Sequence, residues 1–101
     1  MAESKKRGSL RNNALRINEK DNVAIATRAI AKGEPVIVNR EELGEAAESI
    51  KLGHKIALVP IGLAESVVRY GEEVVRTTSS IARGEWVHVH NTEPIPGDLQ
   101  K

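Results

Sequence analysis

The apolar positions of this chain come in short runs. From Ile17 onward, runs rich in Val, Ile and Ala are broken by Gly and Pro at intervals that suit hairpins and bends. Such runs are typical of short strands, because β-branched side chains pack well on a pleated surface. The pattern therefore predicts a mainly β fold that forms a single domain over residues 17–91.

One segment departs from the β pattern. Its apolar side chains recur at helical spacing, at Leu43, Ala46, Ala47 and Ile50. Asn39 can cap the first turn of a helix there, and Gly53 can end it. We therefore expect one short helix, around residues 40–51.

A faint repeat runs through the β-rich part. It consists of an isoleucine, a small residue three positions later and a valine three positions after that. The copies are Ile30, Gly33 and Val36, then Ile61, Ala64 and Val67, then Ile81, Gly84 and Val87. Each copy would place a bend between two strands, since glycine tolerates positive φ. The copies are unevenly spaced, which excludes a solenoid and favours a small, folded-over β module.

The stretch "GEWVHVHN" near the end of the chain holds its only tryptophan and two of its three histidines. On an extended strand, alternate side chains point to opposite faces. Trp86, His88 and His90 would then share one face, while Val87 and Val89 face the core. We expect the indole N–H of Trp86 to find a hydrogen-bond acceptor, at an interface or in part of the core.

The two ends of the chain differ from its middle. Residues 1–16 are polar and basic, with Lys5, Lys6 and Arg7 in a row, and we expect a solvated, flexible tail. Residues 92–101 carry two prolines and a glycine and are expected to form an exit segment. The N-terminus has no apolar stretch behind its charges, so it does not resemble a secretory signal, and a cytoplasmic location is expected.

Composition limits the function that one such domain can carry. The 101 residues are 40% hydrophobic and 29% charged, a globular balance, but only 2% aromatic. A domain of this size has one modest core and little room for an enclosed catalytic cavity. Binding, or assisting a larger enzyme, is therefore favoured over catalysis by this chain alone.

Charge and cysteine content exclude several classes of protein. The net charge of +1 does not favour a nucleic-acid or membrane partner, and no apolar run approaches the length of a membrane span. The chain has no cysteine, which excludes disulfides, thiolate nucleophiles and cysteine-ligated zinc.

The histidine pair is the first candidate site. On a regular strand the Cα atoms of His88 and His90 would lie about 6.5 to 7 Å apart, so both rings could reach one metal ion or one anion. A zinc-type catalytic site needs three protein ligands, and His54 joins the pair only if the fold brings it there. We expect no complete metal site in this chain alone, with His88 and His90 as candidate contributors to one. Asn91 could offer its amide to a substrate hydroxyl or cap the strand end.

His54 and Lys55 follow Gly53 at the start of another alternating segment. Either side chain could donate a charge-assisted hydrogen bond to a carboxylate or sulfonate, or both could lie in solvent at a strand start. Arg69 and Tyr70 are interpreted as the flank of a hairpin rather than as a site.

Four segments in this order resemble the small N-terminal domain of the altronate and galactarate dehydratase family: "DNVAIATRAIAKGEPV", "GHKIALVPI", "VVRYGEEV" and "SIARGEWVHVHN". In that family the domain is an SAF-type module with a β-clip fold. It is either fused ahead of a large catalytic domain or made as a separate small subunit, as in sulfolactate sulfo-lyase. The family usually has glycine at the positions of Ala64 and Val75.

The resemblance implies a role in a metal-dependent hydro-lyase, a carbon–oxygen lyase acting on a sugar acid or hydroxy acid. In that chemistry a base removes the proton next to a carboxylate, while a divalent metal, iron or manganese, helps the leaving group depart. The metal would be held mainly by a large catalytic partner. This chain would line the active site with His54, Lys55, His88, His90 and Asn91.

Two other functions stay open at this point. One is the small subunit of a sulfolactate-type carbon–sulfur lyase, and the other is a stand-alone SAF-type module that binds a sugar acid without catalysis. The resemblance does not decide which hydroxy acid is the substrate, and it leaves a homo-oligomer open.

Overall fold

The computed structural model describes residues 11–95, and every regular element in that range is a strand. The strands are β1 (Ala14–Leu15), β2 (Val23–Ala26), β3 (Pro35–Val38), β4 (Glu41–Glu45), β5 (Lys55–Ala57), β6 (Ser66–Arg69), β7 (Glu72–Thr77), β8 (Trp86–Val87) and β9 (Thr92–Pro94). The predicted mainly β fold is confirmed. None of the described residues forms a helix long and apolar enough to cross a membrane.

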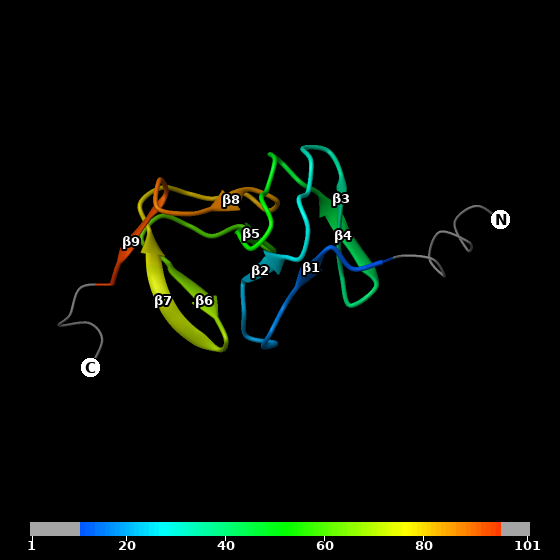
Figure 1. The fold of residues 1–101 in the computed structure, drawn as a ribbon. Helices are drawn as coiled ribbons and strands as arrows, with labels where there is room; N and C mark the ends of the chain where they lie inside the picture. The colour runs from blue at the N-terminus through cyan, green and yellow to red at the C-terminus, as the bar shows by residue number, and fades with distance from the viewer. Residues whose placement is uncertain (1–10, 96–101) are drawn as a thin grey trace.

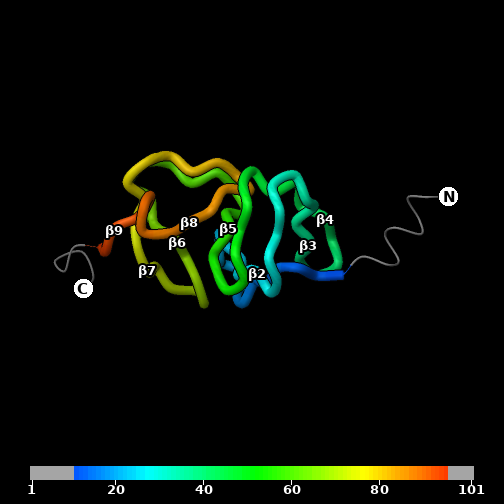
Figure 2. The backbone as a smooth tube through the Cα atoms, turned by 45° about the horizontal axis from the view of Figure 1, so that its top comes forward, coloured from blue at the N-terminus to red at the C-terminus, as the bar shows by residue number. Residues whose placement is uncertain are grey.

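Three antiparallel sheets make up the fold. The central sheet has the order β1-β2-β5-β8, and β3-β4 and β6-β7-β9 form two further sheets. Figure 1 shows the β3-β4 hairpin at one end of the molecule and β6, β7 and β9 at the other, with the central sheet between them. The tube in Figure 2, seen from another direction, shows the same arrangement, with β3 and β4 at one end and β6, β7 and β9 at the other.

The helix predicted over residues 40–51 is wrong. Glu41–Glu45 forms β4, which pairs with β3. Asn39 and Arg40 adopt φ angles of 55° and 62°, and positive φ at both central residues is what a tight type I′ hairpin turn requires. The chain therefore reverses direction where a helix would have begun. Ala46 and Ile50 are buried as predicted, but from an extended, bent segment, and Ala47 is exposed.

The folded part is longer than residues 17–91 at both ends. Ala14 is buried and pairs with Ala26, and β9 pairs with β7 through Thr77 and Thr92. Residues 1–10 and 96–101, which include the run Lys5 to Arg7 and most of the expected exit segment, lie outside the described residues.

The faint repeat of the sequence is a structural repeat with an offset of 31 residues. Ile30 bridges to Ile50, and Ile61 bridges to Ile81 in the same antiparallel manner. Three positions after each isoleucine the chain bends with positive φ, at Gly33 (86°), Gly53 (84°), Ala64 (63°) and Gly84 (88°). The bend therefore occurs four times. The copy that begins at Ile50 was not found in the sequence, because it ends in Ile56 and not in a valine.

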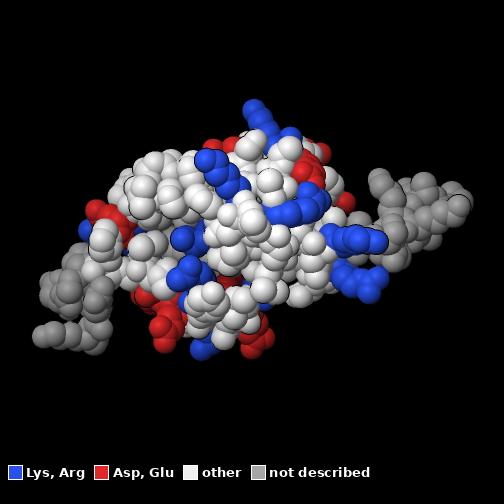
Figure 3. Space-filling view, viewed as in Figure 1, with Lys and Arg blue, Asp and Glu red and all other residues white. Residues whose placement is uncertain are grey.

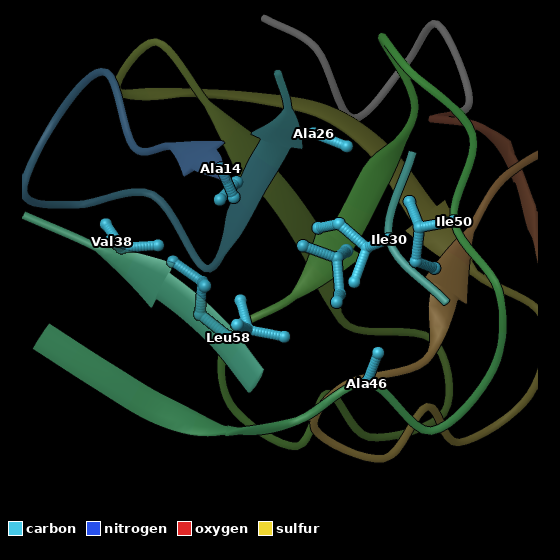
Figure 4. Close-up of a cluster of buried hydrophobic side chains, with 10 residues drawn as sticks. Ala14, Ala26, Ile30, Val38, Ala46, Ile50 and Leu58 are labelled. Atoms are coloured by element: carbon cyan, nitrogen blue, oxygen red, sulfur yellow. The ribbon is translucent and has the colours of Figure 1, made fainter. Parts of the chain in front are cut away.

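Each half of the repeat has its own hydrophobic cluster. Figure 4 shows the first cluster, to which Ile30, Ile50 and Leu58 belong. The second contains the equivalent Ile61 and Ile81, with Val23, Ala57, Val67 and Val87. Both are built from Val, Ile, Leu and Ala, the side chains available in a chain without Phe.

Candidate functional site

Four rings meet beside β8 and form what we term the ring cluster: His54, Trp86, His88 and His90. The indole of Trp86 stacks on the imidazole of His88, with centroids 5.0 Å apart and an interplanar angle of 13°. His54 lies 4.9 Å from His88 between ring centroids, and His90 lies 4.8 Å from Trp86. All three histidines of the chain therefore gather around its only tryptophan.

Strand pairing brings the third histidine to the other two. In the register of β5 and β8, Lys55 lies opposite Val87 and Ile56 opposite Trp86. His54 immediately precedes β5, so its side chain reaches the indole of Trp86. The sequence offered no means of placing His54, because this pairing joins residues about 30 positions apart.

The predicted strand alternation of "GEWVHVHN" holds only as far as Val87. His88, Val89 and His90 form a turn, and Val89 is 79% exposed while Val87 is fully buried. The prediction that Val89 faces the core is therefore wrong. The rings of Trp86, His88 and His90 do come together, but a turn rather than a flat strand face groups them.

Asn91 closes this turn. Its side-chain oxygen accepts the backbone N–H of His88 at 2.9 Å, and its amide nitrogen donates to the carbonyl of Trp86 at 2.8 Å. The hydroxyl of Thr92 donates to the carbonyl of His88 at 2.7 Å. These bonds take the place of the backbone hydrogen bonds that β8 would have made to a neighbouring strand if it continued. This explains why β8 ends at Val87. The largely buried Asn91 amide shapes the loop that presents His88 and His90.

Two hydrogen bonds fix the position of Trp86. Its indole Nε1 donates to Nδ1 of His54 at 3.0 Å, so the expected acceptor for the indole N–H is found. Its backbone N–H donates to the carboxylate of Glu48 at 3.0 Å. Hydrogen bonds therefore hold both the backbone and the indole ring of Trp86, and this orders the ring cluster.

Side chains that can carry positive charge lie near His88. Burial lowers the pKa of His88 below its usual value, and His54, Lys55 and His90 lower it further by charge repulsion. Burial, followed by the charge of Arg69, lowers the pKa of the half-buried Lys55. In both residues the shift favours the neutral form.

Arg69, at the end of β6, flanks the tight turn at Tyr70 and Gly71 of the β6-β7 hairpin, as the sequence predicted. Its guanidinium lies 4.9 Å from the centroid of the Tyr70 ring, and its buried Nε has no hydrogen-bond partner among the described residues. The two salt bridges within residues 11–95 are Arg28 with Glu34 and Arg76 with Glu93, so neither Lys55 nor Arg69 takes part in one. Its proximity to Lys55 depends on how the two halves pack, which no local motif signals.

Charged side chains of both signs lie on the face of the molecule drawn in Figure 3. Lys and Arg side chains lie over the middle of that face and also at its edges, and acidic side chains lie mainly toward the edges. The exposed glutamates of the two hairpins, Glu41, Glu42, Glu72 and Glu73, lie next to the tight turns.

The side chains do not fit a complete metal site. Within residues 11–95, no group of three or more His, Asp or Glu side chains lies close enough together to hold a metal ion. Each imidazole contacts the indole of Trp86, and Nδ1 of His54 accepts its N–H, so the rings are arranged around the indole and not around a shared ligand position.

These features define a small two-lobed β domain that presents a histidine-rich, cationic site at its surface. Residues 12–94 match the family model described as the altronate/galactarate dehydratase SAF domain. The chain belongs to this family.

Three curated relatives carry the same region. Altronate dehydratase of Bacillus subtilis (strain 168) is 40% identical over 86 residues, and that of Escherichia coli (strain K12) is 33% identical over 87 residues. These alignments cover 85% and 86% of this chain but 17% of each relative. The (2R)-sulfolactate sulfo-lyase subunit alpha of Chromohalobacter salexigens is 39% identical over 49 residues, which are 48% of this chain and 52% of that subunit. The chain therefore spans a small part of the altronate dehydratases that it matches.

Proposed function

We propose that this chain is the small subunit or N-terminal domain of a hydro-lyase of the altronate and galactarate dehydratase type, and that it completes the active site of a larger catalytic partner. The observation that carries the proposal is the ring cluster together with the neighbouring Lys55. Neither Lys55 nor Arg69, whose charge acts on Lys55, forms a salt bridge among the described residues. The family membership supplies the type of enzyme.

The substrate class follows from this charge. A sugar acid or hydroxy acid carries a carboxylate, and cationic side chains that have no carboxylate partner of their own are free to bind one. The lowered pKa of His88 keeps its imidazole neutral near pH 7, so it can exchange a hydrogen bond without repelling Lys55. The chain would thus orient the acid group of the substrate.

The chemical step belongs to the partner in this proposal. A divalent metal, iron or manganese, would act there as a Lewis acid on the leaving group. We assign the metal to the larger partner because the described residues of this chain supply no group of three ligands. His88 and His90 stay candidate contributors from this side of the active site.

A second candidate function is the small subunit of a carbon–sulfur lyase. The match to the (2R)-sulfolactate sulfo-lyase subunit alpha favours it, because that relative is itself a subunit and this chain aligns with half of it. A sulfonate is an anion, as a carboxylate is, and the same cations would bind it. A stand-alone module that binds a sugar acid is the remaining alternative.

A domain exchange tests the proposal. The segment of the Bacillus subtilis altronate dehydratase that matches this chain is deleted, or replaced by this chain, and turnover of altronate and of (2R)-sulfolactate is measured. We expect no turnover by this chain alone or by the deletion variant, and altronate dehydration by the chimaera. A deletion variant as active as the parent enzyme would contradict the proposal. Tight binding of altronate by this chain alone would favour the binding module.

A further inference from the structure

The hydrogen bond between Trp86 and His54 determines where His54 carries its proton. An indole N–H can only donate, so the atom that it contacts at 3.0 Å, Nδ1 of His54, must present a lone pair. A neutral imidazole has one proton, which therefore lies on Nε2. A protonated His54 would place two N–H groups against each other, and the bond would be lost.

The same bond decides what His54 can do chemically. Nδ1 is occupied as an acceptor, and Nε2 carries a proton, so neither nitrogen is free to act as a base. A histidine that binds a metal through Nε2 donates its Nδ1–H to an acceptor such as a carboxylate or carbonyl. Here the neighbour of Nδ1 is itself a donor, which is the reverse of that arrangement. His54 is left with one function, to donate through Nε2–H.

The surroundings hold both rings in this arrangement. The Trp86 indole stacks on His88, and His88 in turn contacts His54 at 4.9 Å between ring centroids. The backbone of Trp86 is bonded to Glu48 on one side and to Asn91 on the other. The indole is therefore fixed before any ligand arrives, and Lys55 follows His54 directly in the chain.

We propose that Trp86 is a positioning residue that holds His54 as a neutral imidazole protonated on Nε2, so that His54 donates a hydrogen bond to an oxyanion of the substrate. The oxyanion is the carboxylate of a hydroxy acid, or the sulfonate of its sulfur analogue. This inference rests on the proposed function for the identity of the ligand, but the state of His54 is a property of this chain alone.

The protonation of His54 can be read directly by NMR. The full chain is labelled with ¹⁵N, and the imidazole nitrogens are correlated with the ring C–H protons at about pH 8, where histidines are neutral. We expect His54 to show a protonated Nε2 and an unprotonated Nδ1. A proton on Nδ1 would overturn the inference.

Two variants test whether Trp86 is the cause. Trp86→Phe keeps an aromatic ring but removes the donor, so we expect His54 to populate both neutral tautomers. The control, His90→Phe, changes another ring that contacts Trp86 and leaves the hydrogen bond intact. It should leave the tautomer of His54 unchanged. Identical His54 spectra in Trp86→Phe and the parent chain would show that Trp86 has no such role.

Kinetics of the chimaera described above test the donor role. His54→Gln places an amide N–H near the position of Nε2 but cannot ionise, whereas His54→Ala removes the donor. We expect His54→Gln to keep most of kcat/KM for altronate and His54→Ala to lose about tenfold or more, as for a hydrogen bond to a charged group. Equal losses in both variants would overturn the donor role. Absence of turnover in every chimaera would instead contradict the proposed function, and the NMR result would still decide the tautomer.

Discussion

Asn13 and Asn22 make the same hydrogen bonds in the two halves of the fold. The side-chain oxygen of Asn13 accepts the backbone N–H of Ile37 at 2.8 Å. That of Asn22 accepts the N–H of Val68, which lies 31 positions after Ile37, also at 2.8 Å. Each side-chain amide also donates to the carbonyl two residues before its backbone partner. The repeat thus includes polar side chains that tie each β hairpin to the central sheet, which a hydrophobic pattern does not show.

These two asparagines should both contribute to stability, and Asn13 should contribute more because it is fully buried. Asn13→Ala leaves a buried N–H and a carbonyl without partners, which should lower the free energy of unfolding by about 1 to 3 kcal/mol. Asn22→Ala, at a half-buried position, should cost less. Urea denaturation of both variants checks this, with the exposed Ser79→Ala as the control, expected within about 0.5 kcal/mol of the parent. An Asn13→Ala chain as stable as the control would contradict the structural repeat.

Ala64 should be better replaced by glycine. It is the one bend of the four in the repeat without glycine, and its φ of 63° is strained for a residue with a Cβ atom. Ala64→Gly should raise the free energy of unfolding by about 0.5 to 1 kcal/mol, since relief of the strain exceeds the added flexibility of the unfolded chain. The matched control is the exposed Ala82→Gly, where φ is not positive, and it should destabilise the chain slightly. Loss of stability in Ala64→Gly would contradict the bend geometry.

Val87 and Val89 should respond in opposite ways to a charge. Val87 is fully buried in the second hydrophobic cluster, whereas Val89 is 79% exposed in the turn. Val87→Asp should unfold the chain, because an unpaired buried charge costs several kcal/mol against a typical stability of about 5 to 15 kcal/mol. Val89→Asp should keep a melting temperature near that of the parent. Circular dichroism melts distinguish the two, and unfolding of Val89→Asp would mean that the strand continues through residue 89.

The pKa of His88 predicts how stability depends on pH. Because this pKa is lowered in the folded chain, the unfolded chain takes up the His88 proton first as pH falls. The neutral imidazole is favoured in the folded state, so stability is highest above the ordinary histidine pKa of about 6.5 and falls with acidification below it. His88→Gln should weaken this dependence. The C–H resonances of His88, followed by NMR from about pH 8 to pH 5, would contradict the prediction if they titrated at or above the ordinary value.

Local patterns were sufficient for the strands and the core, because burial of Val, Ile and Ala follows short-range alternation and bend residues. They failed between Asn39 and Ile50, where apolar spacings of three and four fit a helix as well as a bent strand. The turn conformation of Asn39 and Arg40 decided between them. Asn39 is typical of the first central position of a type I′ turn, but Arg40 stands where glycine is usual, so the pair does not signal the turn.

The sequence indicated which residues gather at the candidate site better than it indicated how they are arranged. His54, Lys55, His88 and His90 were all expected, and the structure brings the three imidazoles together with Trp86. Asn91 caps the strand end, one of its two predicted roles, but the sequence did not show that the turn begins as early as His88. Arg69 flanks a hairpin, as predicted, but the sequence could not show that its charge acts on Lys55, because the two residues lie on different strands.

We infer that the ring cluster serves the active site of a larger enzyme. Steady-state kinetics of the chimaera with His88→Ala test this, beside the control Lys32→Gln, an exposed lysine in a turn that does not act on His88. We predict that His88→Ala lowers kcat/KM for altronate about tenfold or more, as expected for a lost contact to a charged substrate, with no change in folding. Lys32→Gln should retain the parent value. Full activity in His88→Ala, in a chimaera that requires this chain for turnover, would contradict the assignment of the ring cluster to the active site.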